Sequence, residues 1–337
     1  MQLQEVPQIV CAPMAGAPST VQLAAAVSDA GGLGFLGMGF QRAEAAAVQI
    51  CELRACTDRP FGVNAFLVRS SGVDQRRLDT YVASIGPDAQ RFGISVGEPR
   101  FDDGDFDAKI EMLIEEPVAV VSFTFGCPDA RIVQALQRAG SLVWVTVTSP
   151  VDALTAVASG CDALVVQGAE AGGHRSSFVD DDEQLDAALD TITLLRHVSR
   201  MASMPLIGAG GIATADDTRA AIAAGATSIQ AGTAFLLAHE AGTHPLHRAA
   251  LGADTQTAFT RAFSGRAARG IVNAFMRDHA DAPAAYPQIH HATTPIRAAA
   301  GDAGDPERMS LWAGTQHQLA QALPAAEIVQ ALRADPH

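Results

Sequence analysis

The feature that most constrains this chain is a regular alternation of short apolar runs with alanine-rich helical segments. Short β-branched apolar runs are typical of strands buried on both faces of a parallel sheet. Their alternation with helical segments predicts an α/β fold built from βα repeats. We predict eight strands, at residues 8–14, 33–37, 61–67, 118–125, 142–147, 163–168, 205–209 and 228–231.

Eight strands joined through helices favour closure into a (β/α)8 barrel, of the TIM-barrel type, although an open doubly wound sheet can hold as many. The helical segments carry ordinary start and stop signals. Ser19 or Thr20 can cap the helix that Gly31 ends, and Asp129 and Gly140 bracket another. We therefore expect a barrel over residues 1–236.

Two segments exceed the minimal βα repeat. Residues 69–117 form a long polar insertion between the third and fourth strands, and residues 237–337 continue past the eighth strand with helical and proline-containing stretches. We expect 237–337 to form a smaller, mostly helical region on the substrate side. Both segments adjoin the C-terminal face of the barrel, so each is a candidate lid or second domain over the site.

Charge and composition exclude several classes of protein. The net charge of −14 argues against a nucleic-acid or anionic-membrane surface, since both need clustered Lys and Arg. Lys109 is the only lysine and sits in a polar segment, whereas Schiff-base and pyridoxal enzymes need a buried lysine. No long apolar stretch predicts a membrane span and no export signal is apparent, so a cytoplasmic location is expected.

The cysteines and most histidines have an ordinary structural interpretation. The five cysteines show no CxxC spacing and are expected to be buried reduced thiols. His244 and His247 have helical spacing but no acidic or thiol partner nearby, so no metal site is predicted. His290 and His291 are expected at the surface.

Glycines and amides gather where the predicted strands end, which is where a barrel places its active site. Gly210 and Gly211 follow the seventh strand, and Gly232 and Thr233 follow the eighth. Glycines also form ordinary βα turns. Two such ends in adjacent repeats nevertheless favour a phosphate site, because glycine lets backbone N–H groups approach an anion closely.

Other strand ends supply polar side chains. Asn64 and Gln167 each offer a donor and an acceptor, which suits the pyrimidine edge of a flavin. Alternation along the fourth strand puts Ser122 and Thr124 toward the barrel axis, with Phe123 and Phe125 against the helices.

His174 is the most specific single candidate for a catalytic residue. An isolated loop histidine usually has solvent or a backbone group as its partner. His174 instead follows Gly172 and Gly173 beyond the sixth strand, on a loop expected to face the ligand. It can therefore serve as a general base or a hydrogen-bond donor. No nucleophile elbow, P-loop or dinucleotide fingerprint follows a suitable strand, so those chemistries are not supported.

These strand ends resemble the nitronate monooxygenases, formerly called 2-nitropropane dioxygenases. The resemblance runs through most of the chain, which makes it far more specific than any single glycine pattern. The segments that carry it are APMAG, AAAVSDAGGLGFLG, FGVNAFL, VVSFTFGCP, VVQGAEAGGHRSSF, PLIGAGGI, SIQAGTAFL and FSGRAARGIVN.

The resemblance implies an FMN-dependent oxidoreductase that uses O2 to oxidise alkyl nitronates, and also nitroalkanes, to a carbonyl compound and nitrite. It implies that His174 is the catalytic base or anion stabiliser. Phe275 and Met276 are expected to exclude water as apolar walls. The substrate pocket is expected to include Ser122, Thr124 and Tyr286. The expected FMN contacts are Met14, Asn64, Gln167, Gly172, Gly173, Gly210, Gly211, Gln230, Ala231, Gly232 and Thr233.

Two residues depart from the family pattern. Ser176 stands where glycine is common, and Thr124 stands where some members carry histidine. The departures concern substrate preference more than the flavin site.

The alternative enzyme is an FMN-dependent NAD(P)H oxidoreductase acting on quinones or enoyl thioesters, and a non-catalytic flavin or phosphate binder is a further alternative. The expected partners are a small-molecule substrate and O2, in a monomer or homodimer.

Overall fold

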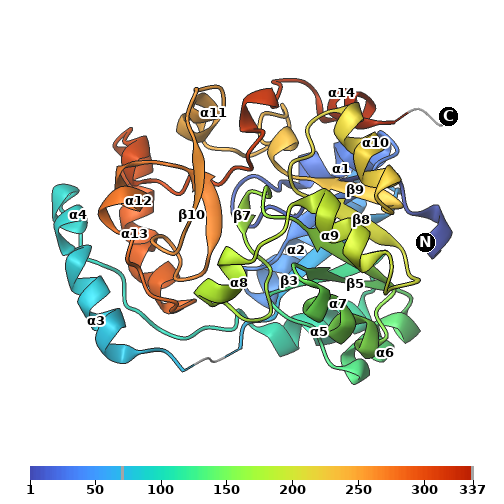
Figure 1. The fold of residues 1–337 in the computed structure, drawn as a ribbon, viewed down its shortest axis with the longest axis horizontal. Coiled ribbons are helices and arrows are strands. Elements are labelled where there is room, and N and C mark those ends of the chain that lie inside the picture. The colour runs from blue at the N-terminus through green and yellow to red at the C-terminus, as the bar shows by residue number, and fades with distance from the viewer. Residues whose placement is uncertain (70–71, 335–337) are drawn as a thin grey trace.

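A computed structural model describes residues 1–69 and 72–334 of the chain (Figure 1). Eight parallel strands form its main sheet in the order β1-β9-β8-β6-β5-β4-β3-β2. The strands are β1 (Ile9–Cys11), β2 (Gly34–Gly37), β3 (Phe61–Phe66), β4 (Val120–Thr124), β5 (Leu142–Val147), β6 (Ala163–Gln167), β8 (Leu206–Ala209) and β9 (Ser228–Ala231).

The two ends of this sheet meet, so the sheet is a closed barrel. Val10 and Leu33 form a parallel bridge, in which Cys11 N donates to Leu33 O at 3.0 Å and Leu33 N donates to Ile9 O at 3.0 Å. The bridge joins β1 to β2 and removes both free edges. The predicted (β/α)8 barrel is confirmed, and the open sheet is excluded.

Side chains fill the barrel interior. The rings of Phe35 and Trp144 lie 5.7 Å apart between Val10, Val120 and Val165, and all five residues are buried. A filled interior leaves no pore, so any ligand must bind at a rim of the barrel.

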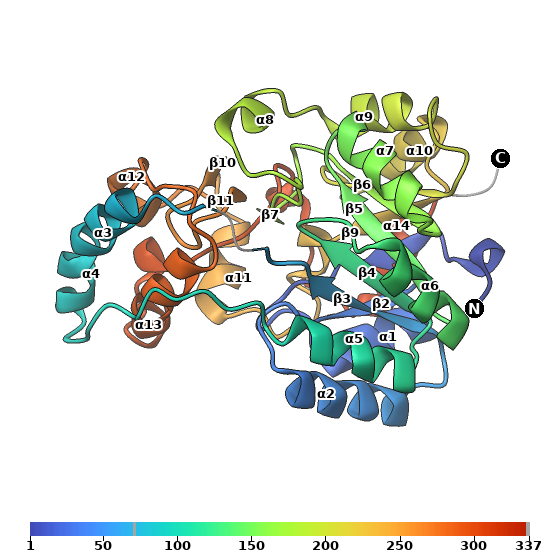
Figure 2. The same ribbon diagram turned by 90° about the horizontal axis from the view of Figure 1, so that it is seen from below.

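A ring of helices covers the outside of the barrel (Figure 2). Thr20 and Asp129 cap two of them as predicted, accepting from Leu23 N at 2.9 Å and Ile132 N at 3.1 Å. The helices are α1 (Val21–Asp29), α2 (Ala43–Cys56), α5 (Phe106–Glu115), α6 (Ala130–Ala139), α7 (Pro150–Ser159), α9 (Thr191–Val198), α10 (Ala215–Ala223) and α14 (Ala325–Leu332).

Two of these helices belong to segments that were expected from the sequence to lie outside the barrel, over its C-terminal face. α5, from the 69–117 insertion, packs beside α2 and α6. α14, from the 237–337 region, packs against α1 and α10 and its apolar residues join the barrel core. The chain therefore leaves the barrel twice and returns to it each time.

The remaining elements form a second lobe, which lies at the left of Figure 1. Its core includes Phe263, Phe275, Ile289 and Ile296, together with Leu78 from the insertion. Its helices are α3 (Gln75–Ser84), α4 (Gly86–Arg91), α11 (Pro245–Leu251), α12 (Ala274–Asp278) and α13 (Gln288–Asp302), with α8 (Asp182–Asp186) near the junction.

A three-stranded antiparallel sheet joins the lobe to the barrel. It has the order β10-β11-β7, from β10 (Thr257–Thr260), β11 (Ala268–Ile271) and β7 (Gly173–His174). His174 pairs with Ala268. His174 is thus held in a short strand, and the expectation of a loop at this position was wrong.

Several surface expectations also need correction. Lys109 is buried, and its Nζ donates to Met38 O at 2.6 Å, where α5 packs beside the end of β2. Cys51 and Cys56 are exposed on α2, whereas the other three cysteines are buried thiols. Among the described helices, none has both the length and the apolarity needed to cross a bilayer.

Candidate active site

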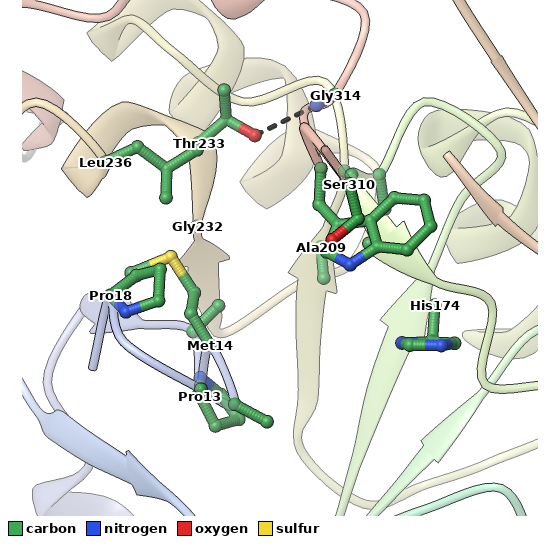
Figure 3. Close-up of a pocket in the computed structure, with 18 of the residues that line it drawn as sticks. Pro13, Met14, Pro18, His174, Ala209, Gly232, Thr233, Leu236, Ser310 and Gly314 are labelled. Carbon is green, nitrogen blue, oxygen red and sulfur yellow. Dashed lines mark hydrogen bonds between the residues drawn. The ribbon is translucent and has the colours of Figure 1, made fainter. Parts of the chain in front are cut away.

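A cavity of about 500 Å³ opens at the C-terminal face of the barrel, between the strand ends and the second lobe. The ends of β1, β3, β4, β6, β8 and β9 contribute to its walls, and α13 covers one side. Figure 3 shows His174 and Met14 on opposite sides of this cavity. The site is therefore where the barrel architecture predicts it.

One end of the cavity is built from backbone. Gly210 and Gly211 have φ of +107° and +64°, conformations that residues with side chains rarely adopt. At Gly172 an added Cβ would lie 2.4 Å from the Ala313 carbonyl carbon. Thr233 Oγ1 accepts from Gly314 N at 3.0 Å (Figure 3). These positions form a cradle of backbone in which side chains would collide with their neighbours or strain the chain, and it suits a phosphate group.

The amide side chains differ in how much hydrogen-bonding capacity remains. Gln167 Nε2 donates to His174 O at 3.1 Å, and its Oε1 accepts from Ser176 N at 2.9 Å. Asn64 Nδ2 donates to Ser122 Oγ at 2.8 Å and to Thr124 Oγ1 at 2.9 Å. Gln230 Oε1 is buried and has no partner in the described chain. Of these three amides, Gln230 is therefore the one whose acceptor oxygen is free.

His174 lies in an aromatic environment. Its ring centroid is 5.5 Å from Trp312, 5.6 Å from Phe125 and 5.8 Å from Tyr286. Its Nε2 lies 2.9 Å from Ser264 Oγ. Ser264 Oγ also donates to Arg266 O at 3.1 Å, so it is well placed to accept the Nε2 proton of a neutral ring.

Burial, together with the positive charges of Arg266 and Arg297, lowers the pKa of His174 to about 3. The ring is therefore neutral at physiological pH. A neutral imidazole is a weak base and a hydrogen-bond donor through one nitrogen only.

The second lobe supplies cavity residues that sequence reasoning missed. His290, Thr294 and Arg297 of α13 line the cavity, and the His290 ring stacks on Phe40 with centroids 4.3 Å apart. The prediction of His290 at the surface was wrong, because α13 folds it over the cavity. The i, i+4, i+7 spacing of these three residues on one helix is the signal that could have indicated a shared face.

Most predicted contacts lie together around the cavity. Ser122 and Tyr286 are not among its lining residues. The Ser122 hydroxyl is buried against Asn64, and the Tyr286 ring lies behind His174 beside Phe125. The predicted residues that line the cavity are Met14, Asn64, Thr124, Gln167, Gly172, Gly173, His174, Gly210, Gly211, Gln230, Ala231, Gly232 and Thr233.

The apolar walls differ from those predicted. Phe275 and Met276 are buried in the core of the second lobe, where Phe275 stacks on Phe263. Phe125 was expected against the helices but has φ of +75°, which breaks the strand alternation and brings its ring to within 4.5 Å of Phe66. Phe66 lines the cavity in place of the predicted walls.

The cavity also includes His244 and His247, the pair without metal-ligand partners. His247 Nε2 lies 3.0 Å from Trp312 O, a single backbone contact. Across residues 1–69 and 72–334, no group of three potential metal ligands is present.

The neutral state of His174 can be tested by NMR. In ¹⁵N-histidine-labelled protein, with the signal assigned through His174→Gln, the ring should remain neutral from about pH 8 to about pH 5, because its pKa lies well below its ordinary value of 6.5. The same protein unfolded in urea is the control and should be protonated at the lower pH. An imidazolium signature for His174 in the folded protein at about pH 6 would contradict the assignment.

Comparison with known proteins identifies the family. The family model described as nitronate monooxygenase matches residues 1–335. Nitronate monooxygenase from Pseudomonas aeruginosa is 39% identical over 335 residues, covering 96% of this chain and 94% of that protein. Probable nitronate monooxygenase from Staphylococcus aureus is 36% identical over 330 residues, covering 95% of this chain and 92% of that protein.

Solved structures agree with these sequence matches. A nitroalkane oxidase from Streptomyces ansochromogenes superposes with a TM-score of 0.95 at 43% identity, covering 97% of this chain and 94% of that chain. FabK from Thermotoga maritima superposes at 0.75 with 29% identity, covering 98% and 92%. The resemblance seen in the strand-end motifs is confirmed along the whole chain, which belongs to the nitronate monooxygenase family of flavin-dependent oxidoreductases.

Proposed function

We propose that this protein binds FMN and oxidises alkyl nitronates with O2, forming a carbonyl compound and nitrite. The observation that carries the proposal is a cavity lined both by a glycine cradle and by the neutral, enclosed imidazole of His174. Membership of the nitronate monooxygenase family supports the reaction class. FMN, when bound, supplies the redox chemistry.

The residues present fit FMN. Backbone N–H groups beside Gly211 and Thr233 would hold the phosphate, where the left-handed glycine conformations leave the amides accessible. The free Oε1 of Gln230 would accept a hydrogen bond from a flavin N–H group, which would satisfy a polar atom otherwise buried without a partner. Met14, on the other side of the cavity from His174, would provide an apolar surface beneath a planar ring.

The charge state of His174 favours a substrate that is already deprotonated. A base with so low a pKa removes a proton from a neutral nitroalkane slowly. A nitronate needs no such step. The positive charges of Arg266 and Arg297, which oppose protonation of His174, favour a bound anion. We therefore propose nitronates as the preferred substrates, with nitroalkanes reacting through proton transfer to His174.

Anaerobic mixing tests the proposed reaction. We expect the purified protein to be yellow and to release FMN on denaturation. Propyl-2-nitronate should bleach the bound flavin within seconds, and admission of air should restore the colour with formation of nitrite. Rapid reduction by NADPH, without nitrite from nitronates, would instead establish the NAD(P)H oxidoreductase.

Gly211→Glu tests the phosphate cradle. The new carboxylate would occupy the cradle and repel the phosphate, and like charges placed together at a binding site cost several kcal/mol. FMN retention should fall by at least about 100-fold in ultrafiltration measurements. Gly160→Glu is the control, because Gly160 has a similar φ of +82° with nothing within 4 Å and lies at the end of α7. Unchanged FMN occupancy in Gly211→Glu would place the phosphate elsewhere.

His174→Asn separates proton transfer from anion binding. Asparagine keeps an N–H donor but has no basic nitrogen, so kcat/KM for nitroethane should fall by about 100-fold or more, the usual contribution of a general base. Activity on preformed ethyl nitronate should fall much less. His197→Asn, on the exposed surface of α9, is the control. Equal losses on the two substrates would remove the base role.

A further inference from the structure

Helix α13 brings one cation to the wall of the cavity. His290, Thr294 and Arg297 lie on one face of this helix, and all three line the cavity. Thr294 is exposed while Arg297 is partly covered, so this face lies at the mouth of the site. Arg297 is also close enough to His174 to depress the pKa of its ring.

The guanidinium of Arg297 is held by neutral groups. Its Nε donates to Thr293 Oγ1 at 3.2 Å, and its Nη2 donates to Thr294 Oγ1 at 2.8 Å and to His290 O at 3.1 Å. Within residues 1–69 and 72–334 it forms no ion pair, and its Nη1 makes no hydrogen bond. The side chain is therefore fixed in place while one donor nitrogen remains available.

Other enclosed arginines of this protein either have a carboxylate counter-ion or lie away from the cavity. Arg261 pairs with Asp180 at 3.1 Å, and Arg308 pairs with Asp88 at 2.5 Å. Arg266 and Arg269 have no carboxylate partner at ion-pair distance in the described chain but donate to backbone carbonyls, and neither lines the cavity. Arg297 combines a missing counter-ion with a position on the cavity wall.

A charge removed from water without a counter-ion is costly. Burial lowers the pKa of Arg297 to about 10, and Tyr286 and Tyr81 oppose this shift. Arg297 therefore remains a cation at neutral pH. An anionic ligand at the cavity mouth would supply the missing counter-ion.

Arg297 also sets the state of its neighbour His290. A guanidinium only donates, so His290 Nδ1, 3.3 Å from Nη2, must accept, and the single proton of the neutral ring lies on Nε2. Burial, together with the charge of Arg297, lowers the pKa of His290 to about 2. Stacking on Phe40 fixes the plane of the ring. His290 is thus a positioned neutral donor beside the cation.

We propose that Arg297 is a specificity-determining residue that binds the negative charge of the substrate, so that the site selects nitronate anions over neutral nitroalkanes. The proposal rests on the proposed function and assigns its anion selectivity to one side chain. A fixed cation in a partly enclosed cavity attracts an anion more strongly than the same cation in water.

Arg297→Gln removes the charge while keeping hydrogen-bonding capacity toward Thr293 and Thr294. We expect KM for ethyl nitronate to rise by about 10- to 100-fold, the range of a charge-assisted hydrogen bond, with kcat little changed. KM for neutral nitroethane should stay within about twofold. Arg297→Lys keeps the charge and should restore much of the nitronate affinity.

A second measurement does not depend on turnover. Nitrate, an unreactive planar anion, is titrated into the FMN-loaded protein while the flavin absorbance is followed. The nitrate Kd should rise at least about tenfold in Arg297→Gln and in Arg297→Met. Arg277→Met is the matched control, because it removes an equal charge from an exposed position of α12, where Arg277 pairs with Glu307 outside the cavity. FMN retention and thermal unfolding report whether each variant folds.

The outcomes separate the two proposals. Unchanged nitronate KM and nitrate Kd in a folded Arg297→Gln or Arg297→Met protein would overturn the role of Arg297. If the wild-type protein oxidises no nitronate but binds nitrate in an Arg297-dependent way, the proposed reaction fails while the anion site stands. If neither Arg297→Gln nor Arg297→Met folds, Arg297→Lys decides, because lysine keeps the positive charge. A KM for ethyl nitronate as high as that for nitroethane in Arg297→Lys would contradict selection by charge.

Discussion

The site depends on how the chain leaves strand β6. Both ends of the Gln167 amide are used by the backbone that follows, at His174 O and Ser176 N. This side chain aligns β7 so that it pairs with β11 of the second lobe. The backbone of His174 is consequently held to the barrel by Gln167 and to the second lobe by pairing with Ala268. The position of the imidazole over the cavity therefore follows from joining the two parts, and neither part alone would set it.

Enclosure then decides the chemistry available to His174. Aromatic rings on several sides remove water from the imidazole, and nearby arginines disfavour a second positive charge. The same desolvation that weakens His174 as a base strengthens the attraction of Arg297 for an anion. A cavity that holds its histidine neutral and its arginine uncompensated is suited to a substrate that arrives already charged.

The glycine-rich end of the cavity, where FMN is proposed to bind, differs because it is made mostly of backbone. Gly172, Gly210 and Gly211 lie where a side chain would either collide with neighbouring backbone or strain the chain. Such positions bind through N–H groups and impose little demand on side-chain identity. This contrast explains why the proposed phosphate cradle could be predicted from glycine spacing, while the residues at the other end of the cavity could not.

The sequence by itself determined the eight strands, the α/β class and the glycines at the strand ends, because apolar periodicity and glycine conformations are local properties. It favoured a barrel, and the bridge between Val10 and Leu33 decided that the sheet closes. Only the tertiary structure decided that Phe125 packs against His174 through a positive φ, and that His290 and Arg297 face the cavity from a helix far along the chain. The physical reason is that charge compensation and desolvation depend on which groups meet across the two lobes. Helical spacing can indicate that His290 and Arg297 share a face, but it does not say what that face contacts.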